Sequence, residues 1–238
     1  IAVLAAACGA TDGGGTTAST MGATQLTGVA DGGELAFAVP RTPVSWSPAT
    51  AWSTSDLQAA RAVYDRLMVR DENGRVVPEL AAKVVASASQ SVWTITLRPG
   101  ITFSDGSPLD ASVVVTNLRA QVGLPVNAGL LDPIATIVAS NATTVVVTMF
   151  TPWSTFPEVL TTRIGTIVAP ATLIGATPTP IGTGPFTYDR TETDGTVVVV
   201  RNQHYWRSGL PRLDAVRFIP IADAAERVDA VLAGRVQM

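Results

Sequence analysis

Strict alternation of apolar and polar side chains marks one segment of the chain most clearly. Residues 91–98 alternate with period two, which places Trp93, Ile95 and Leu97 on one face of an extended segment. A strand with one buried face repeats in this way, because successive side chains point to opposite sides of the sheet. The pattern therefore predicts a half-buried strand here.

Runs of apolar and β-branched residues predict more strands than helices in the rest of the body. Asp71, Glu72, Asn73 and Gly74 separate two short runs and supply the backbone freedom that a hairpin turn needs. The other predicted strands lie over residues 34–40, over 143–150, and in the TYDR, TVVVVR and AVRFIPI segments of the last third.

Capping signals predict two helices near the ends of this body. Ser55 followed by Gln58 matches a capping box and predicts a helix of about twelve residues. Apolar residues recur at helical spacing behind it, namely Leu57, Ala60, Tyr64 and Leu67. Asp223 with Glu226 forms a second capping pair, and Gly234 can close the helix that follows.

A third helix is predicted where two signals conflict. Asp110 offers an N-cap for a helix that ends near Gln121. Residues 113–116 are β-branched, so their intrinsic propensity favours a strand. We expect the cap to prevail and the segment to be helical.

The first 31 residues differ in character from the body. Residues 1–8 are apolar and are interpreted as the remnant of a lipoprotein signal peptide, with the single cysteine, Cys8, as the lipid-bearing residue. Residues 9–31, rich in Gly, Thr and Ser, are interpreted as a flexible tether. The alternative is a cleaved secretory leader with an incidental cysteine. The first interpretation predicts an extracytoplasmic protein that a lipid anchor holds at the cell-envelope membrane.

Composition excludes several classes of function for this chain of 238 residues. One Cys and one His cannot form a zinc site, and we predict neither metal nor cofactor. A formal net charge of −3 argues against nucleic acid as a partner. His204 is the only imidazole, no GxSxG motif is present, and the GTGP of 182–185 lacks the lysine of a phosphate loop. The prediction is therefore a protein that is not an enzyme.

Five stretches of the chain together resemble one known family. In the order of the chain they are YDRLMVRDENGRVVPELA (64–81), WTITLRPGITFSDGSPLDA (93–111), GTGPF (182–186), NQHYW (202–206) and LDAVRFIPIADAAERVDAVLAGRV (213–236). These stretches resemble the family 5 extracellular solute-binding proteins of ABC importers, the oligopeptide, dipeptide and nickel-binding group. Val113 departs from the family, which has an acidic residue there, and residues 46–48 depart from its usual loop after the first strand.

The resemblance implies a fold class and a division of the chain. It implies an α/β fold with mixed sheets and flanking helices, like the type II periplasmic binding proteins. The chain would form one lobe of a two-lobed clamp, with residues 32–50 and 166–238 as its main subdomain and 51–165 as an inserted subdomain. Family members are about twice this length, so the C-terminal lobe is expected to be absent.

The resemblance also implies a function and a set of ligand contacts. The expected protein is a monomeric substrate-binding lipoprotein that captures peptides or a similar small polar solute for the permease subunits of an ABC transporter. The ligand-facing residues implied by analogy are Ser45, Trp46, Trp153 and Thr183. Trp93, Phe103, Gly106 and Tyr205 are expected to shape turns and core instead. Two other functions stay open, a binding module for signalling or adhesion on the same fold and a secreted hydrolase.

Overall fold

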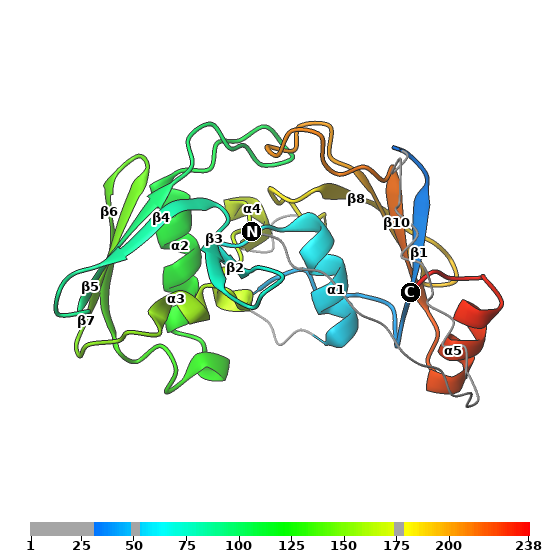
Figure 1. Cartoon of the computed structure of the whole chain (residues 1–238), viewed down its shortest axis with the longest axis horizontal. Helices are drawn as coiled ribbons and strands as arrows, with labels where there is room; N and C mark the ends of the chain where they lie inside the picture. Colours follow the sequence, from blue (N-terminus) through cyan, green and yellow to red (C-terminus); the bar gives the residue numbers. More distant parts are fainter. Residues whose placement is uncertain (1–30, 49–52, 174–178) are drawn as a thin grey trace, which may run out of the picture. The chain divides into compact units, whose positions relative to one another are not determined.

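The computed structural model describes residues 31–48, 53–173 and 179–238 of the chain. The residues from Asp31 onward form one compact unit. Its strands form two four-stranded sheets and a two-stranded hairpin, and helices pack against both sheets (Figure 1). Cys8, residues 9–30 and residues 49–52 lie outside the described ranges, so the predicted lipid anchor and tether are untested.

The first sheet is mixed and has the strand order β1-β10-β9-β8. β1 runs parallel to β10, and the other neighbours are antiparallel. Successive side chains of β1 point to opposite faces of the first sheet. Val39 packs in the cluster that includes α1 and Ala38 in the cluster that includes α5, so helices cover both faces of the sheet. The elements are β1 (Glu34–Val39), α1 (Thr54–Val63), β8 (Phe186–Thr191), β9 (Val197–Arg201), β10 (Ala215–Pro220) and α5 (Ala224–Leu232).

The second sheet is antiparallel and has the order β4-β5-β7-β6. β5 carries the predicted alternation, and Trp93, Ile95 and Leu97 are all buried. That prediction is confirmed, and the three side chains belong to a core to which α2 contributes Val114 and Leu118. The elements are β4 (Ala81–Ala86), β5 (Val92–Leu97), α2 (Ala111–Val122), β6 (Ile134–Asn141) and β7 (Thr144–Met149).

The predicted hairpin forms from two short strands that lie between α1 and β4 in the chain. Its turn residue Gly74 has a left-handed backbone conformation, with a φ of 77°. Its strands are β2 (Met68–Arg70) and β3 (Val76–Pro78). Short helical turns complete the described elements, namely η1 (Pro125–Asn127), α3 (Phe156–Val159), η2 (Arg163–Gly165) and α4 (Pro170–Leu173).

The predicted start of the first helix is wrong. The N-cap of α1 is Ser53, not Ser55, and the reciprocal partner is Asp56, not Gln58. The Asp56 N–H lies 3.1 Å from Ser53 Oγ, and the Ser53 N–H lies 2.9 Å from Asp56 Oδ2. Ser55 instead accepts a bond from the Arg41 N–H. The helix ends at Val63 because the next residue is extended, so Leu67 is buried outside it.

The other two helix predictions are confirmed. Asp110 Oδ1 accepts from the Val113 N–H at 3.0 Å, and α2 runs through the β-branched segment. Burial of Val114 and Val115 outweighs their weak helix propensity. Asp223 likewise caps α5, and Gly234 follows that helix with a φ of 69°.

The assignment of residues to two subdomains stays a prediction. The strands of the first sheet come from residues 34–39 and 186–220, and those of the second from 81–149. Helix α1, within the predicted insertion, packs on the first sheet through Ala59, Ala60 and Val63. Among the described residues, no helix is long and apolar enough to cross a membrane.

Candidate ligand-binding cleft

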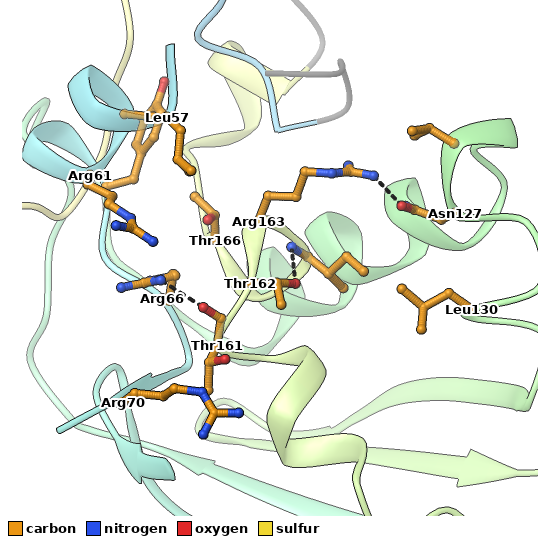
Figure 2. Close-up of a pocket in the computed structure, with 14 residues that line it drawn as sticks. Leu57, Arg61, Arg66, Arg70, Asn127, Leu130, Thr161, Thr162, Arg163 and Thr166 are labelled. Carbon is orange, nitrogen blue, oxygen red and sulfur yellow. Dashed lines mark hydrogen bonds between the residues drawn. The ribbon is translucent and has the colours of Figure 1, made fainter. Parts of the chain in front are cut away.

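A cleft of about 700 Å³ lies beside α1, a size typical of small-molecule sites. One wall comes from α1 and the residues that follow it, and the other from residues 126–130 and 161–166 (Figure 2). The lining residues are Leu57, Ala60, Arg61, Tyr64, Arg66, Arg70, Val126, Asn127, Leu130, Thr161, Thr162, Arg163, Ile164 and Thr166.

Four arginines line this cleft, and no aspartate or glutamate is among its described lining residues. Arg70 forms an ion pair with Glu158, which lies outside the lining, and donates to the Gly74 carbonyl at 2.7 Å. Arg66 donates to the Thr161 carbonyl at 2.7 Å. The cleft is therefore electropositive within an acidic chain.

Arg163 links the cleft wall to the loop after β1. Its Nη1 donates to the Pro48 carbonyl at 3.0 Å and to Gln121 Oε1 at 3.2 Å. Its Nη2 donates to Asn127 Oδ1, and Figure 2 shows the guanidinium extended toward that residue. All of these partners are neutral, and partial burial lowers the pKa of Arg163.

A buried carboxylate, Asp65, lies directly after α1 and gathers donors from two distant segments. Thr183 Oγ1 donates to Asp65 Oδ2 at 3.2 Å, and Trp206 Nε1 donates to the same oxygen at 2.7 Å. The Tyr205 hydroxyl donates to Oδ1 at 3.3 Å. Asp65 is 4% exposed, so these bonds replace the water it loses on folding.

The environment of Asp65 favours its protonated form. Burial raises its pKa, and the charge of Glu79 raises it further. Hydrogen bonds from Trp206 and Thr183 and the charge of Arg207 act in the opposite direction, and the resulting pKa is about 7.

Glu79 holds the neighbouring part of the same network. Its carboxylate accepts from the Arg66 N–H at 2.9 Å and from Arg207 Nη2 at 2.7 Å. The Trp206 ring is contacted by two guanidiniums, with Arg207 at 4.7 Å and Arg98 at 5.5 Å from its centroid. Trp206 therefore packs through its ring and bonds to Asp65 through its edge.

The glycines of the GTGP motif let the chain pass close to the end of α1. A Cβ at Gly182 would lie 2.1 Å from the Val63 carbonyl oxygen, and one at Gly184 would lie 2.5 Å from it. The Gly184 N–H donates to that oxygen at 2.9 Å. The motif thus serves close backbone packing, which places Thr183 against Asp65.

The structure places Ser45 and Trp46 together on the loop between β1 and α1. The Ser45 N–H lies 3.1 Å from Asp56 Oδ1, so the residue that completes the capping box of α1 also holds this loop. The Trp46 ring meets Tyr188 edge-on at 5.7 Å and packs against the core of the first sheet. Both residues are partly exposed.

The other two predicted ligand residues lie elsewhere. Trp153 packs 5.5 Å from Phe156 in the core of the second sheet, and its Nε1 donates to Thr155 Oγ1. Thr183 is buried against Asp65. None of the four predicted residues is among the lining of the arginine-rich cleft, and their ligand contacts stay predictions.

Two features of the site escape sequence reasoning, namely the Asp65 network and the arginine lining. The sequence does point to the Asp65 network, because its members all lie in the stretches that resemble the family, namely Asp65, Glu79, Thr183 and Trp206. The four arginines of the lining lie in no recognisable spacing. Within the described ranges, no three His, Cys, Asp or Glu side chains are placed to hold a metal ion.

Solved structures with the same fold define the class of this protein. PBP AgaA of A. tumefaciens R10, in complex with agropinic acid, aligns with a TM-score of 0.77 at 25% identity, over 86% of this chain and 43% of its own. The Escherichia coli murein tripeptide binding protein MppA aligns with a TM-score of 0.76 at 25% identity, over 85% and 45%. The fold is the α/β fold of type II periplasmic binding proteins, with mixed sheets and flanking helices, as expected.

The family follows from a direct match. Residues 75–238 match the bacterial extracellular solute-binding proteins, family 5, and the chain belongs to this family. The glutathione-binding protein GsiB of Escherichia coli K12 is 30% identical over 214 residues, which cover 86% of this chain and 41% of the relative. The chain thus spans about two fifths of the length of the curated relatives it matches.

Proposed function

We propose that this protein captures a peptide or a similar small polar solute and delivers it to the permease of a bacterial ABC importer. Membership of the solute-binding family carries this proposal. The names of its relatives give the expected solute class, because GsiB is a glutathione-binding protein and MppA a murein tripeptide binding protein. The proposed role requires no bond to be made or broken.

The structure supports a rigid lobe that presents a binding surface. Asp56 holds the loop with Ser45 and Trp46 onto α1, through bonds of 2.8 Å from the Val44 N–H and 3.1 Å from the Ser45 N–H. A held loop needs little ordering when a solute arrives, which favours affinity. In the proposed mechanism a second lobe closes over the solute, and the solute favours closure by its greater affinity for the closed state.

The proposal extends to the place of action. The protein would act as a monomer outside the cytoplasmic membrane, held there by acyl chains on Cys8. Two or more acyl chains would anchor a protein stably, since each buried CH₂ contributes about 0.8 kcal/mol.

A binding experiment tests the proposed function. Protein expressed from its complete reading frame would be titrated with glutathione and with di- to pentapeptides of mixed sequence, while its melting temperature and heat of binding are recorded. A bound solute at one hundred times its Kd should stabilise the fold by about 2.7 kcal/mol. Absence of binding by every peptide at millimolar concentration would contradict a peptide-class solute.

A further inference from the structure

Two arginines, Arg61 and Arg66, line the same wall of the arginine-rich cleft. Arg61 belongs to the last turn of α1, and Arg66 follows three residues after that helix ends. Figure 2 shows both side chains at the cleft, on the side formed by α1 and the residues that follow it. Burial lowers the pKa of Arg66, Glu79 counteracts this, and the charge of Arg61 lowers the pKa further.

The acidic groups near this pair are already engaged. Glu79 accepts from Arg207 and from the Arg66 backbone, and Asp65 is buried among its own donors. Glu158 pairs with Arg70. Among the ion pairs of the described residues, none joins Arg61 or Arg66 to a carboxylate.

Like charges on one wall repel each other, and an anion bound between Arg61 and Arg66 would relieve that repulsion. Guanidinium groups are suited to this task, because their planar fork of donors matches the oxygens of a carboxylate or a phosphate. The walls of the cleft exclude part of the surrounding water, which strengthens such contacts.

The opposite wall of the cleft carries exposed apolar side chains beside Arg163, Asn127 and three threonines. Val126 is 54% exposed and Leu130 is 48% exposed, and both line the cleft with Leu57 and Ile164. Exposed apolar side chains that line a concave surface are suited to the apolar part of a ligand. The cleft thus places Arg61 and Arg66 opposite two exposed apolar side chains.

We propose that this cleft binds a small organic anion, with its oxyanion held by Arg61 and Arg66 and its apolar part packed on Val126 and Leu130. The oxyanion is a carboxylate or a phosphate. This inference rests on the proposed solute-binding function and narrows the solute to an acidic one. It adds contacts beyond the loop residues predicted from the sequence.

Three probes of matched shape test the proposal on the full chain. They are 3-phenylpropionate, phenyl phosphate and the neutral 3-phenylpropionamide, titrated by calorimetry and by the NMR shifts of arginine side-chain N–H groups. Either anion should bind at least tenfold more tightly than the amide, with an affinity that falls as salt rises. The stronger of the two anions identifies the oxyanion. Equal binding of all three probes would overturn the proposal.

Charge-removing variants locate the site. Arg61→Gln should weaken anion binding about tenfold and leave amide binding unchanged, and Arg61→Lys should recover part of the loss. Arg235→Gln is the matched control, because Arg235 is also exposed and also lacks an ion pair among the described residues. Equal affinity of the Arg61→Gln and Arg235→Gln proteins would place the anion elsewhere and contradict the assignment.

Arg66→Gln provides a second test, with its melting temperature measured first because Arg66 also bonds to the Thr161 carbonyl.

The outcomes separate this inference from the proposed function. Binding of neutral peptides without Arg61-dependent anion binding would refute the anion site alone. Arg61-dependent anion binding without any peptide binding would refute the peptide class alone.

Discussion

The indole Nε1 of Trp206 lies 2.7 Å from Oδ2 of Asp65, which precedes it by 141 residues. This bond joins the residues after α1 to the segment that follows β9. Thr183 reaches the same oxygen from the GTGP motif. Three of the stretches that resemble the family, 64–81, 182–186 and 202–206, therefore meet at one buried carboxylate. Their role at this point is to hold the fold together.

Protonation of Asp65 should make stability fall as pH rises. Its pKa is about 7 in the fold and near 3.8 in an unfolded chain, so only the folded chain keeps this proton between those values. The resulting stabilisation is complete below pH 4 and is lost as the pH rises to 7. Over this range the free energy of unfolding should fall by about 4 kcal/mol. Asp65→Asn should remove this dependence, which urea unfolding at several pH values would measure. Parallel stability curves for both proteins would contradict the assignment.

Asp110→Asn is the control for that experiment. Hydrogen bonds from Ser112 and Val113 lower the pKa of Asp110, so its contribution is present above pH 3.8 and is lost only in stronger acid. The Asp110→Asn protein should therefore show the same change in the free energy of unfolding between pH 4 and pH 7 as the wild type.

Gly184→Ala should destabilise the fold strongly. The new Cβ would lie 2.5 Å from the backbone carbonyl of Val63, and backbone atoms cannot move aside as a side-chain end can. Overpacking of this kind costs roughly 1–3 kcal/mol, and we expect the upper end. Gly123→Ala is the control, because Gly123 has a φ of −84° and no atom within 4 Å of a new Cβ. Chemical denaturation of both variants would check the difference, and equal stability would refute it.

Asp56→Ala should cost more stability than removal of an ordinary helix cap. Asp56 accepts from Ser53 in the cap of α1 and also from the Val44 and Ser45 N–H groups. Loss of the Asp56 carboxylate leaves these donors without their acceptor, which should lower the free energy of unfolding by about 3 kcal/mol. Asp223→Ala, at the exposed cap of α5, should cost about 1 kcal/mol. Similar losses in both variants would show that the loop does not depend on Asp56.

Trp46→Ala should weaken solute binding by about tenfold if the loop after β1 contacts the solute, since an aromatic contact contributes roughly 0.5–1.5 kcal/mol beyond its area. Protein from the complete reading frame would be titrated with the peptide library. Val44→Ala, on the same loop and 73% exposed, is the control. Unchanged affinity of the Trp46→Ala protein would remove Trp46 from the site.

Cys8→Ser should release the protein from membranes. Full-length protein made in a bacterial host should partition into detergent when Cys8 carries acyl chains, and the serine variant should stay in the aqueous phase. Equal partitioning of the two proteins would refute the lipoprotein proposal.

Strands were predictable where the sequence alternates with period two or carries an unbroken β-branched run, as in β9. Trp93, Ile95 and Leu97 of β5 alternate without interruption, and the strand was predicted. β4 and β6 were not, because their sequences AAKVVA and IATIVASN have neither a strict period-two alternation nor an unbroken apolar run. The start of α1 was misplaced because two capping patterns overlap there, and the choice depends on bonds from Asp56 to the preceding loop.

The cleft was not predictable, because its two walls come from segments far apart in the chain. Arg61 and Arg66 follow one another closely, but Arg163 comes from a separate segment almost one hundred residues later. No spacing in one sequence reveals such a meeting. The motifs around Asp65 were recognisable as a set, but their shared buried carboxylate became visible only in three dimensions.

The parallel pairing of β1 with β10 governs the order in which this protein can be assembled. Glu34 pairs with Ala215, and the Gly33 N–H donates to Asp214 across 181 residues. However the chain is delivered to its place of folding, β1 stays without its neighbour until those 181 residues have followed it. During that time its unpaired edge is open to other strands. Assembly of the first sheet is therefore a late event, and a chaperone that shields the early strand would raise the yield of folded protein.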